Sequence, residues 1–312
     1  MGTWKYKLKL KIRRFLWKVL GGRDTTEDVK KLQSQVDALH YYLNSLHDIR
    51  KVPPTADKDL RMLQLCDIQL LIIIDKLCKK HHLNFWLDYG TLLGAYRHGG
   101  FIPWDDDMDI SMLRSDYSQI AQIVNNELGK YGINARESER SIGIEYLHKE
   151  TGIWIDIFVV NSFKSSNEYS TEENLIHKIV KDFEIKAIER GEKVMFNDLA
   201  KIIKDRLENQ ILKESSFQYL YRFPGYYGPE FIWKEDDIYP LSTLNFEGYS
   251  FSVPNKTTNC LKQYYTENFM SFPKSDVLHH GIGRTPLSTW AKAHNVDMNA
   301  VLDKLKEISK TL

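Results

Sequence analysis

The chain has 312 residues, 42% of them hydrophobic, and a formal net charge of +1. This length suits one large globular domain with an appendage, and so balanced a charge does not favour nucleic acid as a partner. The three cysteines lie far apart without a CxxC pair, which indicates a reducing compartment and a cytoplasmic protein rather than a disulfide framework; they are Cys66, Cys78 and Cys260.

Residues 1–22 are a basic amphipathic segment. They carry Lys and Arg but no acid through "MGTWKYKLKLKIRRFLWKVL", and apolar residues recur there at helical spacing, namely Trp4, Leu8, Ile12, Phe15, Leu16, Val19 and Leu20. This pattern favours a helix that lies on an anionic membrane surface. The alternative is a basic arm that packs on the protein or stays disordered. Charges interrupt every candidate apolar core, so a signal peptide is not expected.

Residues 27–50 carry apolar side chains at alternating spacings of three and four, which are Val29, Leu32, Val36, Leu39, Leu43 and Leu46. A heptad seam of this kind predicts a short coiled-coil helix. It allows a homo-oligomer or packing against the main domain. The segment "VPPTADKD" then ends the helix and indicates a linker.

The main domain is predicted to occupy residues 58–312. We expect an apolar helix over 59–82, a charged helix over about 115–129, and a hairpin of the apolar strands "SIGIEYLH" and "GIWIDIFVV". Residues of about 170–222 read as a polar helical insertion, and 219–254 as loops with short strands. The longest apolar run, in "IQLLIIIDKL", is far shorter than the roughly 20 residues needed to cross a bilayer.

The segment "GTLLGAYRHGGFIPWDDDMDI" ends in a cluster of acids. If residues 104–112 form a strand, Asp105, Asp107 and Asp109 share one face, and apolar side chains take the other. Carboxylates held so close either take up protons or bind a cation, and a hard divalent cation is the simplest partner. An EF-hand calcium loop is disfavoured, because Ile110 stands where that loop needs Gly and Asp116 where it needs Glu.

Asp156 is a further acid, in the otherwise apolar strand "IWIDIFVV". If this strand lies beside the one that bears Asp107 and Asp109, three carboxylates converge on one cation. An Asp satisfied by local backbone donors is the alternative.

The residues before the acids predict a phosphate site. Gly90 and Thr91 offer backbone amides and a hydroxyl, and Arg97 and His98 offer cationic or proton-carrying groups. A plain turn with a surface Arg and His is the alternative. The chain contains no GxxxxGK[ST], GxGxxG or HExxH motif, so the remaining interpretation is metal-assisted phosphoryl chemistry.

The stretch "LDYGTLLGAYRHGGFIPWDDDMDISMLRSDY" resembles the LicD family, which is related to the fukutins. The resemblance is strong over about 58–118, weaker through "WIDIF", and returns at "FEGYSFSVPNKTTNCLKQYYTENFMSFP" with His279 and His280. Its "YYTENFMSFP" departs from the Tyr-Gly stretch of the family. The resemblance implies an α/β (α+β) nucleotidyltransferase-like fold, a mixed sheet flanked by helices.

The resemblance also implies roles for the site residues. Asp107, Asp109 and Asp156 would bind Mg²⁺ or Mn²⁺, and Asp105 would be a further ligand or the base for the acceptor hydroxyl. Thr91 and Arg97 would contact the diphosphate of a CDP-alcohol donor.

The implied activity is transfer of a phospho-alcohol, foremost phosphocholine from CDP-choline, to a sugar hydroxyl of a lipid-linked oligosaccharide or polysaccharide. Such acceptors become cell-wall glycans such as teichoic acid or capsule, which implies a peripheral protein on the inner face of a bacterial membrane. Two alternatives are a nucleotidyltransferase that moves an NMP and releases pyrophosphate, and a non-catalytic scaffold on the membrane.

Overall fold

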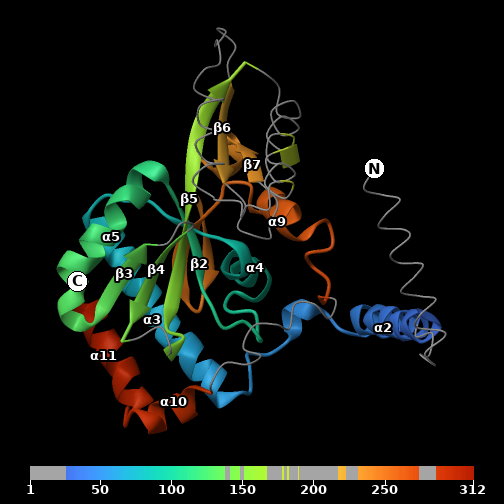
Figure 1. Cartoon of the computed structure of the whole chain (residues 1–312), viewed down its shortest axis with the longest axis horizontal. Coiled ribbons are helices and arrows are strands. Elements are labelled where there is room, and N and C mark those ends of the chain that lie inside the picture. The colour runs from blue at the N-terminus through green and yellow to red at the C-terminus, as the bar shows by residue number, and fades with distance from the viewer. Residues whose placement is uncertain are drawn as a thin grey trace. The chain divides into compact units, whose positions relative to one another are not determined.

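The computed structural model describes residues 26–137, 141–147, 151–166, 178, 181, 182, 189, 217–222, 231–273 and 286–312 (Figure 1). The predicted basic helix at 1–22, most of the predicted insertion at 170–222, and both His279 and His280 lie outside these residues. The chain divides into two compact units, Met1–Ile49 and Arg50–Leu312.

The first unit contains helix α2 (Thr26–Leu46), which confirms the predicted heptad helix over most of its length. The helix ends at Leu46 rather than near residue 50, and a short 3₁₀ helix, η1 (Ile49–Lys51), follows the break. Within this unit, no other described element covers the heptad face of α2.

The second unit is built on a mixed sheet with the strand order β1-β2-β5-β4-β3. The strands are β1 (Trp86–Leu87), β2 (Asp109–Leu113), β3 (Ile133–Glu137), β4 (Ser141–Tyr146) and β5 (Trp154–Ser165). Strands β2 and β5 run parallel, and the other neighbours in this order are antiparallel. The predicted hairpin is confirmed as β4 and β5.

Strand β5 is long enough to serve two partners in succession. Its first half lies between β2 and β4, and its second half pairs with β6 (Phe217–Arg222), which pairs in turn with β7 (Phe231–Lys234). The prediction of helix up to residue 222 is therefore wrong for 217–222. The aromatic-rich run "FQYLYR" suits a pleated surface and continues the sheet instead.

A second correction concerns the predicted strand at 104–112, which begins only at Asp109. The amide of Asp105 donates to the carbonyl of Ile102 at 2.9 Å and closes a turn, so the chain cannot enter the sheet there. Pairing begins where the Asp88 amide donates to the Asp109 carbonyl at 3.0 Å.

Helices cover the sheet (Figure 1). Helix α3 (Lys58–Lys80) is capped by Asp57, confirms the helix predicted at 59–82, and packs beside α11 (Met298–Thr311). Its apolar face is fully buried, including Leu70, Ile73 and Leu77. Helix α5 (Arg114–Leu128) confirms the helix predicted near 115–129 and packs on β3, and η2 (Gly129–Tyr131) follows it.

Several of the remaining elements contact helix α4 (Tyr89–His98), whose first turn lies beside the acids. Helix α4 contacts β2, helix α9 (Thr257–Tyr265) and the hairpin of β8 (Ser242–Phe246) and β9 (Tyr249–Val253). Short helices α8 (Glu235–Ile238) and α10 (Leu287–Ala293) complete the unit. No helix among the described residues combines the length and apolar character needed to cross a membrane.

Candidate active site

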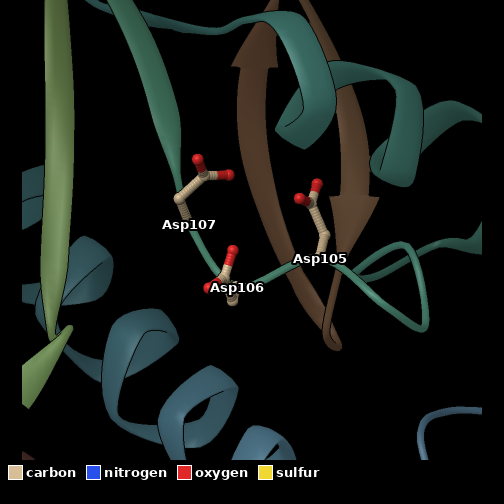
Figure 2. Close-up of side chains that lie close together, drawn as sticks. All are labelled: Asp105, Asp106 and Asp107. Atoms are coloured by element: carbon tan, nitrogen blue, oxygen red, sulfur yellow. The ribbon is translucent and has the colours of Figure 1, made fainter. Parts of the chain in front are cut away.

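The loop before β2 gathers three acids. Asp105, Asp106 and Asp107 each offer a carboxylate oxygen, and these three atoms lie within 4.8 Å of one another. Asp105 and Asp106 are buried and Asp107 is half-buried (Figure 2). The sequence interpretation left Asp106 out, because it assumed the alternation of a strand. The turn places neighbouring acids on one side instead.

Asp109 and Asp156 come together from two strands. Because β2 and β5 are parallel with Asp109 opposite Asp156, both side chains lie on the same face of the sheet. The two strands do lie side by side, but Asp107, expected on the same strand as Asp109, lies in the loop before β2. The hydroxyl of Ser141, on β4, donates to Asp156 at 3.0 Å. Side chains from three strands, β2, β4 and β5, therefore contribute to this acidic site.

The electrostatics of this site are unfavourable without a cation. Burial raises the pKa of Asp109 well above its ordinary value, and the charges of Asp107, Asp156, Asp105 and Asp88 raise it further. A carboxyl in this setting is costly to ionise. A bound cation would offset the repulsion.

The start of α4 fits closely against the acids. A Cβ added at Gly90 would lie 2.6 Å from Oδ2 of Asp105, so any larger residue would displace that carboxylate. The amide of Asp109 donates to the Thr91 hydroxyl at 2.8 Å, which ties the helix to β2. The carbonyl of Asp105 accepts from the buried Gln64 side chain at 2.9 Å. The start of α4 thus contacts both Asp105 and Asp109, through Gly90 and Thr91 respectively.

Arg97 and His98 lie in the last turn of α4, about 9 to 12 Å along the helix axis from Gly90 and Thr91. Arg97 is buried and donates to the Phe269 carbonyl and to Nε2 of His98, each at 3.0 Å. Burial lowers the pKa of Arg97 to about 10, an effect opposed by Tyr265 and Asp105. Arg97 therefore stays charged at neutral pH.

The structure makes His98 a neutral group near pH 7. Burial, and then the charge of Arg97, lower the pKa of His98 to about 4. Because Nε2 accepts from Arg97, Nδ1 carries the proton. That buried Nδ1 has no hydrogen-bond partner among the described residues.

Tyr265 is a further titratable group whose pKa responds to the acids, and the sequence interpretation gave it no role. Burial raises its pKa well above the ordinary value, and Asp109 and Asp105 raise it further, which places the phenol in the field of the acids. Tyr265 ends α9, in a Tyr-rich stretch whose pattern gives no hint of which ring approaches the acids.

The donor set fits a hard divalent cation. In the group found among the described residues, which is Asp105, Asp106 and Asp107, every candidate ligand atom is a carboxylate oxygen. Asp109 and Asp156 are not members of this group. Oxygen-only sets favour Mg²⁺ or Mn²⁺ over zinc. The like charges around Asp109, and the packing of the Asp105 carboxylate against Gly90, also favour a bound divalent cation.

Comparison with known proteins identifies the domain. Residues 82–200 match the family described as "LicD/FKTN/FKRP, nucleotidyltransferase domain". A lipopolysaccharide cholinephosphotransferase LicD of Haemophilus influenzae is 24% identical over an alignment of 256 residues that covers 72% of this chain and 96% of that protein. An uncharacterized protein of Rickettsia typhi is 36% identical over 110 residues, 32% of this chain and 35% of its own. Human ribitol 5-phosphate transferase FKRP is 43% identical over 47 residues, 15% of this chain and 10% of its own.

The mixed sheet, the acid-bearing β2 and the matched segment define a nucleotidyltransferase-type domain. Within that class, residues 82–200 are similar to the LicD family.

Proposed function

We propose that this protein is a metal-dependent phosphotransferase that moves a phospho-alcohol from a CDP-alcohol onto a sugar hydroxyl of a cell-surface glycan precursor. The observation that carries the proposal is the register of Asp109 with Asp156, beside the gathered Asp105, Asp106 and Asp107. The names of the relatives from Haemophilus influenzae and human agree on the reaction class, since both denote transfer of a phosphorylated alcohol.

In the proposed reaction, an acceptor hydroxyl attacks the phosphorus that bears the alcohol. A new P–O bond to the sugar forms, the P–O bond to CMP breaks, and CMP leaves with its electron pair. Asp105 is the proposed base for the acceptor proton, because its carboxylate lies against Gly90 at the start of α4, where the donor is proposed to bind. Asp107, Asp109 and Asp156 would hold Mg²⁺ or Mn²⁺, which when bound supplies charge stabilisation to phosphate oxygens.

The start of α4 is the proposed binding surface for the donor diphosphate. Gly90 allows close approach of the backbone, and the N-terminal end of a ten-residue helix favours negative charge. Arg97 contributes positive charge from the far end of the helix, although its donors to Phe269 and His98 are already engaged. We therefore assign Arg97 a supporting electrostatic role and His98 an anchoring one.

The identity of the alcohol in the CDP-alcohol donor is a separate part of the proposal. Phosphocholine is the first candidate because of the Haemophilus relative, and ribitol phosphate the second because of the human one. A quaternary ammonium group is usually held by an aromatic cage. A panel of CDP-choline, CDP-ethanolamine, CDP-glycerol and CDP-ribitol, assayed for CMP release with Mg²⁺ or Mn²⁺ and a soluble oligosaccharide, tests the proposal. Pyrophosphate release from a nucleoside triphosphate instead would support nucleotidyl transfer.

We further propose that the protein works as a dimer on a membrane. Val29 and Val36 alternate with Leu32 and Leu39 along α2, and β-branched residues at one core position with Leu at the other favour a two-stranded parallel coiled coil. The basic, amphipathic residues 1–22 are suited to an anionic leaflet on the cytoplasmic side, where the lipid-linked acceptor would be held.

A further inference from the structure

Arg222 is a buried cation inside a box of aromatic rings. It is the last residue of β6 and only 3% exposed. The centre of its guanidinium lies close to five ring centroids, at 4.2 Å from Tyr89, 5.3 Å from Trp233, 5.4 Å from both Phe158 and Phe231, and 5.5 Å from Tyr264. Five rings from four elements, α4, β5, β7 and α9, thus enclose one charge.

The guanidinium is held at its polar end by three groups. Nη1 of Arg222 donates to Oδ2 of Asp88 in a buried ion pair and to the Ser111 hydroxyl at 3.0 Å. Nη2 donates to the Tyr264 hydroxyl at 3.2 Å. The Ser111 hydroxyl itself donates to Oδ2 of Asp88. The planar fork of an arginine suits this arrangement, and the single charge of a lysine would not reproduce it.

Asp88 and Ser111 belong to the two elements that build the acidic site. Oδ1 of Asp88 accepts from the Tyr89 amide at 2.9 Å and begins α4, and the Asp88 amide donates to the Asp109 carbonyl. Ser111 lies on β2, two residues beyond Asp109. Arg222 therefore donates hydrogen bonds both to Asp88, which caps α4, and to Ser111 on β2, the strand that carries Asp109.

The charge of Arg222 matters as much as its hydrogen bonds. Asp88 is buried and would otherwise add one more uncompensated carboxylate to a site that already holds several. Removing one partner of a buried ion pair leaves the other charge unpaired in a medium of low dielectric. The five rings and three polar partners also occupy the surroundings of the guanidinium, so it is not offered to a phosphate.

We propose that Arg222 is a positioning residue, which acts through Asp88 and Ser111 to fix the first turn of α4 against β2. This inference rests on the proposed function, since it takes the surface from Gly90 to Asp109 as the place where the donor is bound. Arg222 would set the spacing between the donor diphosphate and the metal-binding acids without touching either.

The test compares Arg222→Met and Arg222→Lys with Arg114→Met as a matched control. Arg114 lies over the Tyr117 ring and donates to Asn161, so the control removes an arginine with similar contacts on the surface of the same domain. We expect Arg222→Met to lower kcat about 10- to 100-fold with little change in KM for the donor, since small misplacements have effects of this size. The kcat of Arg222→Lys should lie between those of Arg222→Met and the parent, and the kcat of Arg114→Met should equal that of the parent.

A double variant separates positioning from loss of folding. Arg222→Met alone leaves the buried Asp88 carboxylate without its partner. Adding Asp88→Asn removes that charge but does not restore the bonds through which Arg222 holds α4 against β2. The double variant should therefore regain the parental melting temperature but not the parental kcat. The double variant can replace Arg222→Met in the kinetic comparison if Arg222→Met alone is insoluble. A kcat within twofold of the parent in the stable double variant would overturn the proposal. So would a gain in affinity for CDP-choline, which would mark the box as a site for the alcohol.

Hydrogen exchange gives a readout that needs no activity. Peptides that cover the start of α4 and strand β2 should exchange faster in Arg222→Met, while those from α3 and α11 should not change. If the parent releases no CMP from any CDP-alcohol, the proposed function fails, and the exchange data still decide whether Arg222 clamps the two elements. Unchanged exchange at α4 and β2 would overturn the clamp itself.

Discussion

Asp109 on β2 and Asp156 on β5 are direct register partners in parallel strands, 47 positions apart in the sequence. Both carboxylates lie on one face, beside the loop that gathers Asp105, Asp106 and Asp107. So many acids at one edge raise the pKa of Asp109, because its ionised form meets burial and several like charges. The expected consequences of a cation at this edge can be measured.

We expect Asp107→Asn and Asp109→Asn to lose transfer while they keep the fold. Losing a ligand removes several kcal/mol of transition-state stabilisation, which is a decrease in rate of at least about 100-fold. Without metal, both variants should melt above the parent, because one repelling charge is gone. Asp303→Asn is the control, since it removes an exposed acid paired only with Lys306 on α11. Near-normal turnover in either site variant would refute the metal assignment.

Gly90→Ala tests the close approach of α4 to Asp105. The added Cβ would lie 2.6 Å from Oδ2 of Asp105, so the carboxylate must move, and we expect CMP release to decrease about tenfold or more. Gly129→Ala is the matched control, because its nearest neighbour would be at an ordinary 3.7 Å and its φ is −55°. Equal rates for the two variants would show that Asp105 has room to adapt.

The pH dependence of stability contains a contribution from His98. Its pKa falls from 6.5 to about 4 on folding, so the unfolded chain binds more protons between these values, and stability is lost as the pH falls through them. We expect His98→Gln to lose less stability than the parent between pH 7 and pH 5. Urea unfolding at both pH values measures this difference. An identical loss in both proteins would show that His98 is not held neutral.

Replacing Leu39 and Leu43 of α2 with serine should lower the oligomeric state without a change in transfer to a soluble acceptor. Ala38→Ser is the control, because Ala38 lies outside the heptad seam. Light scattering over a range of concentrations decides the matter. A monomeric parent, or a double variant of parental mass, would reassign the seam to packing within one chain.

Removal of residues 1–22 should release the protein from anionic vesicles and slow transfer to a lipid-linked acceptor only. Each basic residue near an anionic leaflet contributes about 1 kcal/mol, so the binding should weaken as salt is added. Activity on a soluble oligosaccharide should stay at the parental level. Continued sedimentation with vesicles would place the membrane contact elsewhere, and loss of soluble activity would make the segment part of the folded domain.

Regular apolar periodicity accounts for what could be predicted from the sequence. The helix expected at 59–82 is α3, and the two apolar strands form the β4–β5 hairpin with Asp156 facing out of the core. The strand predicted from residue 104 was wrong before Asp109, because the Asp105 amide donates to the Ile102 carbonyl and closes a turn. That bond is invisible in a pattern of apolar and polar residues.

The larger omission concerns partners distant in sequence. Arg222 stands in a polar, Tyr-rich stretch, and its pairing with Asp88 spans 134 positions. Tyr265 ends α9, which packs against α4, a contact that is likewise distant in sequence. Local propensity and spacing carry no information on such contacts, since these depend on how β6 continues the sheet and how the rings close around the guanidinium.

Mass spectrometry of a soluble oligosaccharide acceptor, after incubation with the four CDP-alcohols and Mg²⁺ or Mn²⁺, observes the proposed transfer itself. We expect the glycan to gain the mass of one phospho-alcohol, with equimolar CMP, in the parent protein and not in Asp109→Asn. A glycan that gains a nucleoside monophosphate, or that stays unmodified with every donor while the protein is folded and metal-loaded, would contradict the proposal.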